Sequence, residues 1–155
     1  MAESDRQRQA VPPAASAAGR TSAAWTALRA GQGLESLRLT VSAAANERYW
    51  RAAGVSHPRL AAGALYPPIA ANLTILCFQQ TVPDAMIQTR QRLKCHRIAD
   101  AGVELCTTGL VVDRYEKRGR EYVDIETHVV TADAPDAPLW HSWVTFTPAA
   151  TLGPA

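Results

Sequence analysis

The sequence predicts an α+β domain in which a curved antiparallel β-sheet wraps around one central helix. Residues Ile69–Gln79 are apolar on most sides, which is typical of a helix that is buried in a core. From Met86 to Thr147 the chain then shows several strand-like segments separated by short turns. A strongly curved antiparallel sheet can cover a helix with one face and leave its other face wetter. The 155 residues are enough for a single domain with a sizeable core.

Composition and charge exclude several classes of protein. The net charge is only +2, and the basic residues form no concentrated face, so nucleic-acid binding is not expected. No apolar run is long enough to span a membrane, and the N-terminus lacks the apolar core of a secretory signal. The three cysteines, Cys77, Cys95 and Cys106, are dispersed and lack a metal-binding spacing. We therefore expect a cytoplasmic protein with reduced thiols, no metal and no membrane segment.

Both ends of the chain are expected to lie outside the domain. Residues Met1–Ser22 are rich in Ala, Pro, Ser, Gln and Arg and contain almost nothing to bury, which is typical of a disordered tail. Pro148 ends the last strand-like segment, and a short tail follows it. We therefore predict a single domain over residues 23–148, with tails at 1–22 and 149–155.

Three features are predicted before the central helix. Apolar and polar residues alternate over Leu37–Val41, which indicates a strand. Ser42 follows as a candidate N-cap of a second helix, with Asn46 as a competing cap one turn later. An irregular loop is expected over Val55–Tyr66. A pair of prolines then opens the central helix, where a proline in the first turn costs no hydrogen bond.

Strand signals dominate the second half of the chain. The clearest alternation lies between residues 121 and 131, where β-branched residues share one face and polar residues share the other. A charged segment centred on Gly119 precedes this strand and predicts a hairpin turn. The predicted strands are Ile87–Ile98, Val103–Tyr115, Glu121–Thr131 and Leu139–Thr147.

The sequence of one loop is similar to the signature of a known protein family. The segment Gly54–Leu60 reads GVSHPRL, and Gly54 and Pro58 fall where the signature G-D-x-N-P-x-H has its glycine and proline. In this respect the chain resembles the MaoC-like (R)-specific enoyl-CoA hydratases and dehydratases, especially their N-terminal type of unit. The resemblance covers about residues 34–148 and includes the phrases YWRAAG, LYPP and DRYEKRG. It implies a single hot-dog domain, in which the sheet wraps around the central helix.

The chain departs from this signature at the positions that carry the chemistry. Val55 stands where the family has its catalytic aspartate, and Leu60 stands where it has its catalytic histidine. In the resembling enzymes this pair performs general acid–base catalysis, moving protons between water and the α-carbon of an enoyl thioester. Neither valine nor leucine can carry a proton, so no catalytic residue is intact. His57 is the remaining candidate for a substitute base or a thioester-contacting donor, although we favour a loop histidine that bonds the backbone or faces water.

The resemblance also implies where an acyl thioester would bind. The start of the central helix, near Pro68–Ala70, should present unpaired backbone N–H groups that can polarise a thioester carbonyl. Basic side chains on the following strand are candidates for the phosphates of coenzyme A, although a solvated strand face is the plainer interpretation. No cofactor is expected beyond the coenzyme A or acyl carrier protein that carries the substrate. The predicted substrate-binding residues are Gly63, Tyr66, Pro68, Ile69, Arg92 and Lys94.

These inferences lead to one favoured function and two alternatives. The favoured hypothesis is a non-catalytic or weakly catalytic subunit of a heteromeric enoyl-thioester hydratase or 3-hydroxyacyl-thioester dehydratase, which contributes to acyl-thioester binding. Hot-dog units normally pair edge to edge, so we expect a homodimer or a heterodimer with a catalytically competent hot-dog subunit. The first alternative is a self-sufficient hydratase that uses His57, or a thioesterase that uses Glu47 or Asp84. The second is a module that binds an acyl thioester or a protein without catalysis.

Overall fold

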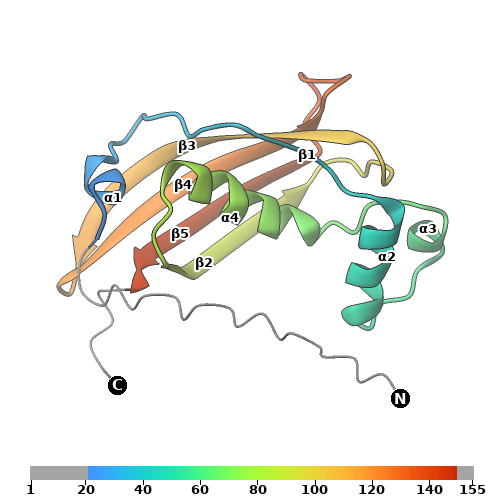
Figure 1. The fold of residues 1–155 in the computed structure, drawn as a ribbon, viewed down its shortest axis with the longest axis horizontal. Coiled ribbons are helices and arrows are strands. Elements are labelled where there is room, and N and C mark those ends of the chain that lie inside the picture. Colours follow the sequence, from blue (N-terminus) through green and yellow to red (C-terminus); the bar gives the residue numbers. More distant parts are fainter. Residues whose placement is uncertain (1–20, 150–155) are drawn as a thin grey trace, which may run out of the picture.

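The structure is a computed structural model, and it describes residues 21–149 of the chain. A five-stranded antiparallel sheet with the strand order β1-β3-β4-β5-β2 packs one face against the helix α4 (Figure 1). The predicted α+β class, with a sheet wrapped around one central helix, is confirmed. The elements are α1 (Ala23–Ala27), β1 (Leu37–Thr40), α2 (Ala43–Ala52), α3 (Pro58–Ala61), α4 (Ile69–Thr81), β2 (Met86–Cys95), β3 (Glu104–Lys117), β4 (Arg120–Thr131) and β5 (Trp140–Pro148).

Helix α4 forms the centre of the core because most of its length is apolar. Phe78 is fully buried near the end of the helix, where it stacks on Phe146 of β5 with ring centroids 4.8 Å apart. Trp25 of α1 meets the same Phe78 ring edge-on. One turn earlier, Leu73 is 2% exposed and joins a second apolar cluster that includes Trp140. Helix α4 therefore contributes to both hydrophobic clusters of the domain.

The sheet has an inner face, which meets α4, and an outer face, which points away from it. On β4, the side chains of Val123, Ile125 and Val129 are buried on the inner face. Glu126 and His128 alternate with them and point outward. This is the predicted alternation, and it fixes the register because a shift of one residue would turn the buried side chains to solvent. Strands β1 and β2 form the two edges of the sheet.

Helix α1 has no counterpart among the predicted elements. Its N-cap is Ser22, whose hydroxyl accepts a hydrogen bond from the backbone N–H of Trp25. The Ser22 hydroxyl and backbone N–H also donate to the carboxylate of Asp84, so the folded part includes a residue that the sequence assigned to the tail. Residues 1–20 and 150–155 of the predicted tails lie outside the described residues. Among residues 21–149, no helix is long and apolar enough to cross a membrane.

A tight turn joins the two longest strands, β3 and β4. Lys117 pairs with Arg120, so only Arg118 and Gly119 lie between the strands. Both residues have positive φ angles, 55° for Arg118 and 71° for Gly119. This is the pattern of a type I′ turn, whose twist matches that of the flanking strands. The predicted hairpin turn centred on Gly119 is therefore confirmed.

Candidate functional site

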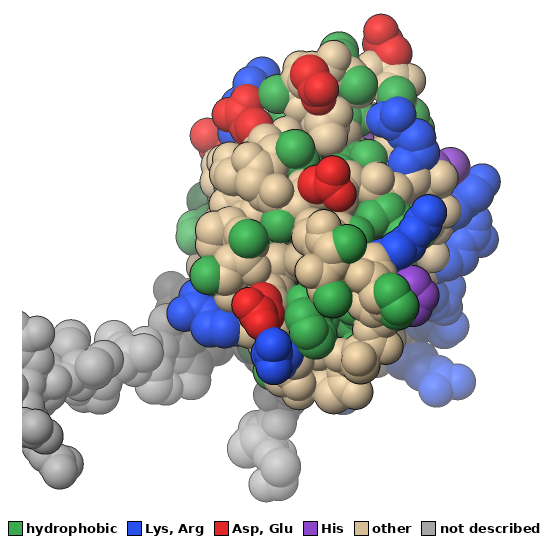
Figure 2. Space-filling view, turned by 90° about the vertical axis from the view of Figure 1, so that its right-hand side faces the viewer, with side chains coloured by type: hydrophobic (Ala, Val, Ile, Leu, Met, Phe, Trp, Pro, Cys, Tyr) green, Lys and Arg blue, Asp and Glu red, His purple; other side chains and the backbone are tan. Residues whose placement is uncertain are grey.

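A hollow at one end of the domain marks the candidate site. It has a volume of about 240 Å³ and lies between α2 and the loop that contains α3. Glu47 and Trp50 line it from α2, whereas Leu60 and Gly63 line it from the loop. Both helices lie at the N-terminal end of α4 in Figure 1, and Figure 2 views the molecule from this end. The signature-like segment Gly54–Leu60 therefore contributes to the wall of the hollow.

A buried asparagine holds the loop against α2. The Nδ2 atom of Asn46 donates to the carbonyl oxygen of Ala64 at 2.9 Å, and its Oδ1 atom accepts from the backbone N–H of Tyr66 at 2.9 Å. The residue is 2% exposed, so these bonds are shielded from water. The expectation that Asn46 competes as an N-cap is wrong, because Ser42 caps α2 by accepting from the N–H of Ala45.

Replacement of Asn46 by alanine is expected to destabilise the domain by about 1–3 kcal/mol, because a buried N–H and a buried carbonyl lose their partner. The measurement is the free energy of unfolding in urea. Asn72→Ala is the matched control, because Asn72 is exposed on α4. Its side-chain amide donates a hydrogen bond to the Tyr49 hydroxyl and holds no buried backbone group. We expect the control to change stability by less than about 0.5 kcal/mol. An Asn46→Ala variant that unfolds like the parent would show that the loop does not depend on this residue.

The loop presents no acid–base pair at the positions of the signature. Leu60 is 8% exposed and lines the hollow with an apolar side chain. Val55 is half-buried, and its backbone N–H donates to the carbonyl of Trp50. The exposed His57 is the N-cap of α3, a short helix inside the predicted irregular loop, and its Nδ1 atom accepts from the N–H of Arg59 at 3.1 Å. One ring nitrogen of His57 is thus already used by the backbone.

The first turn of α4 differs from the expectation. The N–H of Ile69 donates to the carbonyl of Tyr66, and the N–H of Ala70 donates to that of Pro67, each at 3.0 Å. The expectation of unpaired N–H groups near Pro68–Ala70 is therefore wrong for both donors. Because these hydrogens are occupied, the turn offers no ready-made pair of donors for a thioester oxygen.

Comparison with known proteins identifies the fold. No family model and no curated protein matches the chain. The 3R-hydroxyacyl-ACP dehydratase complex HadBC of Mycobacterium tuberculosis matches with a TM-score of 0.64 at 17% identity, over 76% of this chain and 96% of that chain. The R-hydratase PhaJ1 of Pseudomonas aeruginosa matches with a TM-score of 0.66 at 15% identity, over 80% of this chain and 84% of that chain. A MaoC-like dehydratase of Rhodospirillum rubrum matches with a TM-score of 0.64 at 17% identity, over 78% of this chain and 92% of that chain.

The chain is a hot-dog domain. It shares this fold with MaoC-like dehydratases and (R)-hydratases, in agreement with the resemblance of its loop. The predicted substrate-binding residues at the start of α4 occupy different environments in the hot-dog domain. Gly63 lines the hollow. Tyr66 is half-buried, and the centroid of its ring lies 6.0 Å from that of the Tyr49 ring. Pro68 is exposed at the N-cap of α4, whereas Ile69 is 6% exposed within the core.

The two basic candidates lie elsewhere on the hot-dog domain. Arg92 and Lys94 belong to the edge strand β2, where they pair with Trp143 and His141 on the outer face. The guanidinium carbon of Arg92 lies 4.1 Å from the centroid of the Trp143 ring. Gly63 lines the hollow on the helix side of the sheet. The structure therefore does not bring Arg92 and Lys94 together with the predicted residues of the loop.

Other groups that could serve as a base are occupied or remote. Glu47 lines the hollow, but its carboxylate pairs with Arg51 at 2.6 Å. Asp84 follows the C-terminal end of α4, away from the loop, and accepts from Ser22. Burial raises the pKa of the Cys77 thiol to about 11, so the thiol stays protonated in the core of the hot-dog domain at neutral pH.

Two histidines lie on the outer face of the sheet, opposite the side that carries the hollow. His128 of β4 and His141 of β5 are register partners. Burial lowers the pKa of His141, and the neighbouring His128 acts in the same direction, whereas Glu126 opposes the change. His141 is therefore uncharged at neutral pH. Neither histidine can act as a base in the hollow, because the sheet separates them from it.

Proposed function

We propose that this hot-dog domain is a subunit of an enoyl-thioester hydratase or 3-hydroxyacyl-thioester dehydratase, and that it helps to bind the acyl thioester without transferring protons. The observation that carries the proposal is the composition of the loop wall. Val55 and Leu60 stand where the resembling enzymes have their aspartate and histidine, and Leu60 turns an apolar side chain into the hollow. The apolar loop side of the hollow suits an acyl chain, whereas the acid–base chemistry of the resembling enzymes needs ionisable groups at these loop positions.

The open edge of the sheet supports pairing with a different chain. Strand β2 is an edge strand, so within residues 21–149 one row of its backbone groups has no neighbouring strand. Arg90, Arg92 and Lys94 all lie on this strand, so two copies that paired edge to edge would bring positive charges close together. Like charges that lie directly opposite each other destabilise a strand pair. Figure 2 shows Lys and Arg side chains gathered along one flank of the molecule. A partner with an acidic or neutral edge would avoid this repulsion.

The similarity to HadBC adds a precedent, since that structure is described as a complex. In the proposed assembly the partner supplies an intact aspartate and histidine. The chain described here supplies the hollow beside α2 and part of the acyl-binding surface. The proposal therefore separates two tasks, binding and proton transfer, between two subunits with the same fold.

The test is hydration of crotonyl-coenzyme A and of a longer enoyl thioester, measured for the purified chain alone and with a hot-dog subunit from the same genome that carries the intact signature. The chain alone should give a rate close to background. The mixture should turn over the longer substrate faster than the competent subunit alone. Robust hydration by the isolated chain would contradict the proposal. Complex formation without any change in turnover would favour a binding module.

A further inference from the structure

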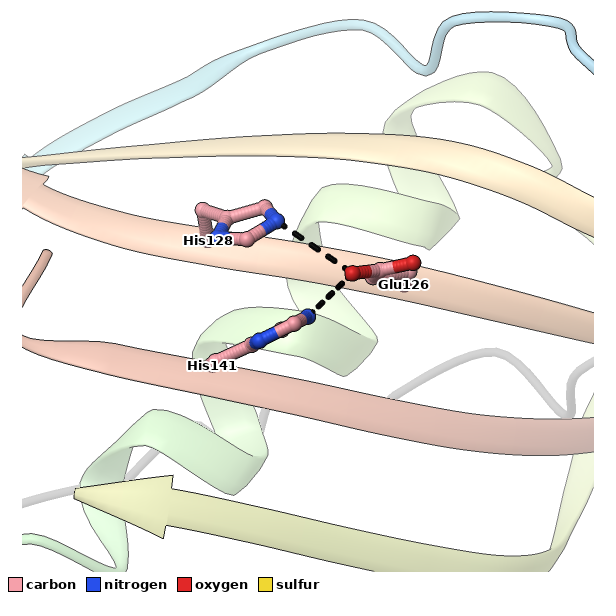
Figure 3. A group of neighbouring side chains, drawn as sticks. All are labelled: Glu126, His128 and His141. Atoms are coloured by element: carbon pink, nitrogen blue, oxygen red, sulfur yellow. Dashed lines mark ion pairs between the residues drawn. The ribbon is translucent and has the colours of Figure 1, made fainter.

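A compact group of two histidines and one glutamate lies on the outer face of the sheet (Figure 3). Glu126 and His128 are two residues apart on β4, and His141 lies directly opposite His128 on β5. The Nε2 atom of His128 is 3.5 Å from Oε1 of Glu126, and the Nε2 atom of His141 contacts the same oxygen. One ligand atom from each residue lies within 4.8 Å of the other two. Three side chains therefore converge on one point above the sheet.

The fold itself produces this convergence. Residues two apart on a strand project from the same face, and register partners on neighbouring strands bring their Cβ atoms to about 4.5–5.5 Å. The imidazole of His141 is held between the rings of His128 and Trp143, with centroid distances of 4.0 Å and 3.6 Å. Its side chain is 16% exposed, whereas that of His128 is 46% exposed. The group thus has one rigid, shielded member and one side that is open to solvent.

We propose that Glu126, His128 and His141 form a binding site for a divalent transition-metal ion of the Zn²⁺ class. Two imidazole nitrogens and one carboxylate oxygen are an established donor set for zinc, and an open fourth position can be filled by water. Zinc requires ligand distances of about 2.0–2.2 Å. Small rotations of the exposed His128 and of the Glu126 carboxylate are enough to separate the three ligand atoms around an ion. The site lies on the opposite face of the sheet from the hollow and does not rest on the proposed function.

The surroundings select this class of ion over calcium and magnesium. The group contains a single carboxylate, whereas hard cations are held by several oxygen ligands. Lys94 is the register partner of His141, and Arg92 lies over the Trp143 ring, so the neighbourhood carries positive charge. The binding free energy of an ion at this position must therefore come from coordinate bonds to imidazole, which zinc, copper and nickel form well.

The experiment is calorimetric titration of the full chain with Zn²⁺, after removal of any affinity tag and treatment with a chelator. We expect one saturable site per chain. His128→Ala should weaken zinc binding at least about tenfold, since even the loss of a group that only hydrogen-bonds to a ligand commonly costs about 10–100-fold in metal affinity. Glu126→Gln should weaken it in the same direction while keeping the shape of the side chain. Circular dichroism verifies that both variants fold.

The matched control is the double variant His57→Ala/His96→Ala, which removes the two histidines outside the group. It should bind zinc with the affinity of the parent. A Cys95→Ser variant should also retain binding, because that exposed thiol is not a ligand. Zinc affinity that is unchanged in a folded His128→Ala variant would overturn the proposal. Loss of binding in the control, or absence of a saturable site in the parent, would overturn it as well.

Discussion

Leu73→Asp is expected to destabilise the domain by at least about 4 kcal/mol, which combines the loss of a buried leucine with the burial of an unpaired charge. Leu73 is 2% exposed in the middle of α4 and packs in the cluster that contains Trp140 and Leu105. A charge there has no partner and no access to water, because the sheet covers this side of the helix. A loss of this size is a large share of the total stability of a typical domain, about 5–15 kcal/mol.

The measurement is thermal unfolding followed by circular dichroism, in which a loss of about 4 kcal/mol lowers Tm by roughly 10 °C or more. Leu76→Asp is the control, because Leu76 lies one turn away on the same helix and is 44% exposed. The control changes the same residue type in the same helix, so it isolates the effect of burial. We expect it to cost only about 1 kcal/mol, because aspartate is a poorer helix former than leucine and only part of the side chain is buried. Equal melting of both variants would show that α4 is not packed as described.

In the proposed assembly with a competent subunit, His57→Ala is expected to leave turnover almost unchanged. A general base typically contributes about 10²–10⁴-fold to the rate, so its removal would be unmistakable. His57 instead uses Nδ1 to cap α3, and the sequence resemblance assigns Leu60 to the position where the resembling enzymes have their histidine. Substituting the catalytic histidine of the competent subunit should lower turnover by the full factor of about 10²–10⁴. These two variants compare a loop histidine with a catalytic one in the same complex.

The complementary variant grafts the missing pair into this chain. Val55→Asp with Leu60→His should leave the isolated chain close to background, because catalysis also needs a supporting shell that holds the pair in position. Leu60 is 8% exposed, so the new imidazole would be buried beside apolar neighbours. The readout is crotonyl-coenzyme A hydration over a range of pH. Strong activity in the parent chain that His57→Ala abolishes would make His57 the catalyst and refute the division of tasks.

The sequence is sufficient to predict the parts of the fold that carry their own periodicity. The apolar run at Ile69–Gln79 lies within α4, and the alternation at Glu121–Thr131 lies within β4. Burial dictates both patterns, since a helix inside a core is apolar all round and a sheet with one covered face alternates. The assignment of Val55 and Leu60 to the catalytic positions rests on the spacing of Gly54 and Pro58 and stays a prediction.

The parts that the sequence could not predict depend on contacts between distant residues. Asn46 bonds Ala64 and Tyr66, which lie 18 and 20 positions further along, and no local signal distinguishes this role from that of a helix cap. The histidine pair on the outer face becomes apparent only from the register of β4 against β5. The paired N–H groups of α4 depend on how the chain turns before the helix. In each case the missing information is the position of a second segment in space.

The tight turn at Arg118 and Gly119 has a consequence for the order of events during folding. The strands that it joins are neighbours in sequence, so this hairpin closes over a short loop and can form within about 1–10 μs. The pairings of β1 with β3 and of β2 with β5 span long stretches of chain; Leu37 of β1, for example, meets Thr107 of β3. Loop closure makes such distant pairings slower. We therefore expect substitutions in the hairpin to slow refolding and substitutions in β1 to speed unfolding, which stopped-flow kinetics would distinguish.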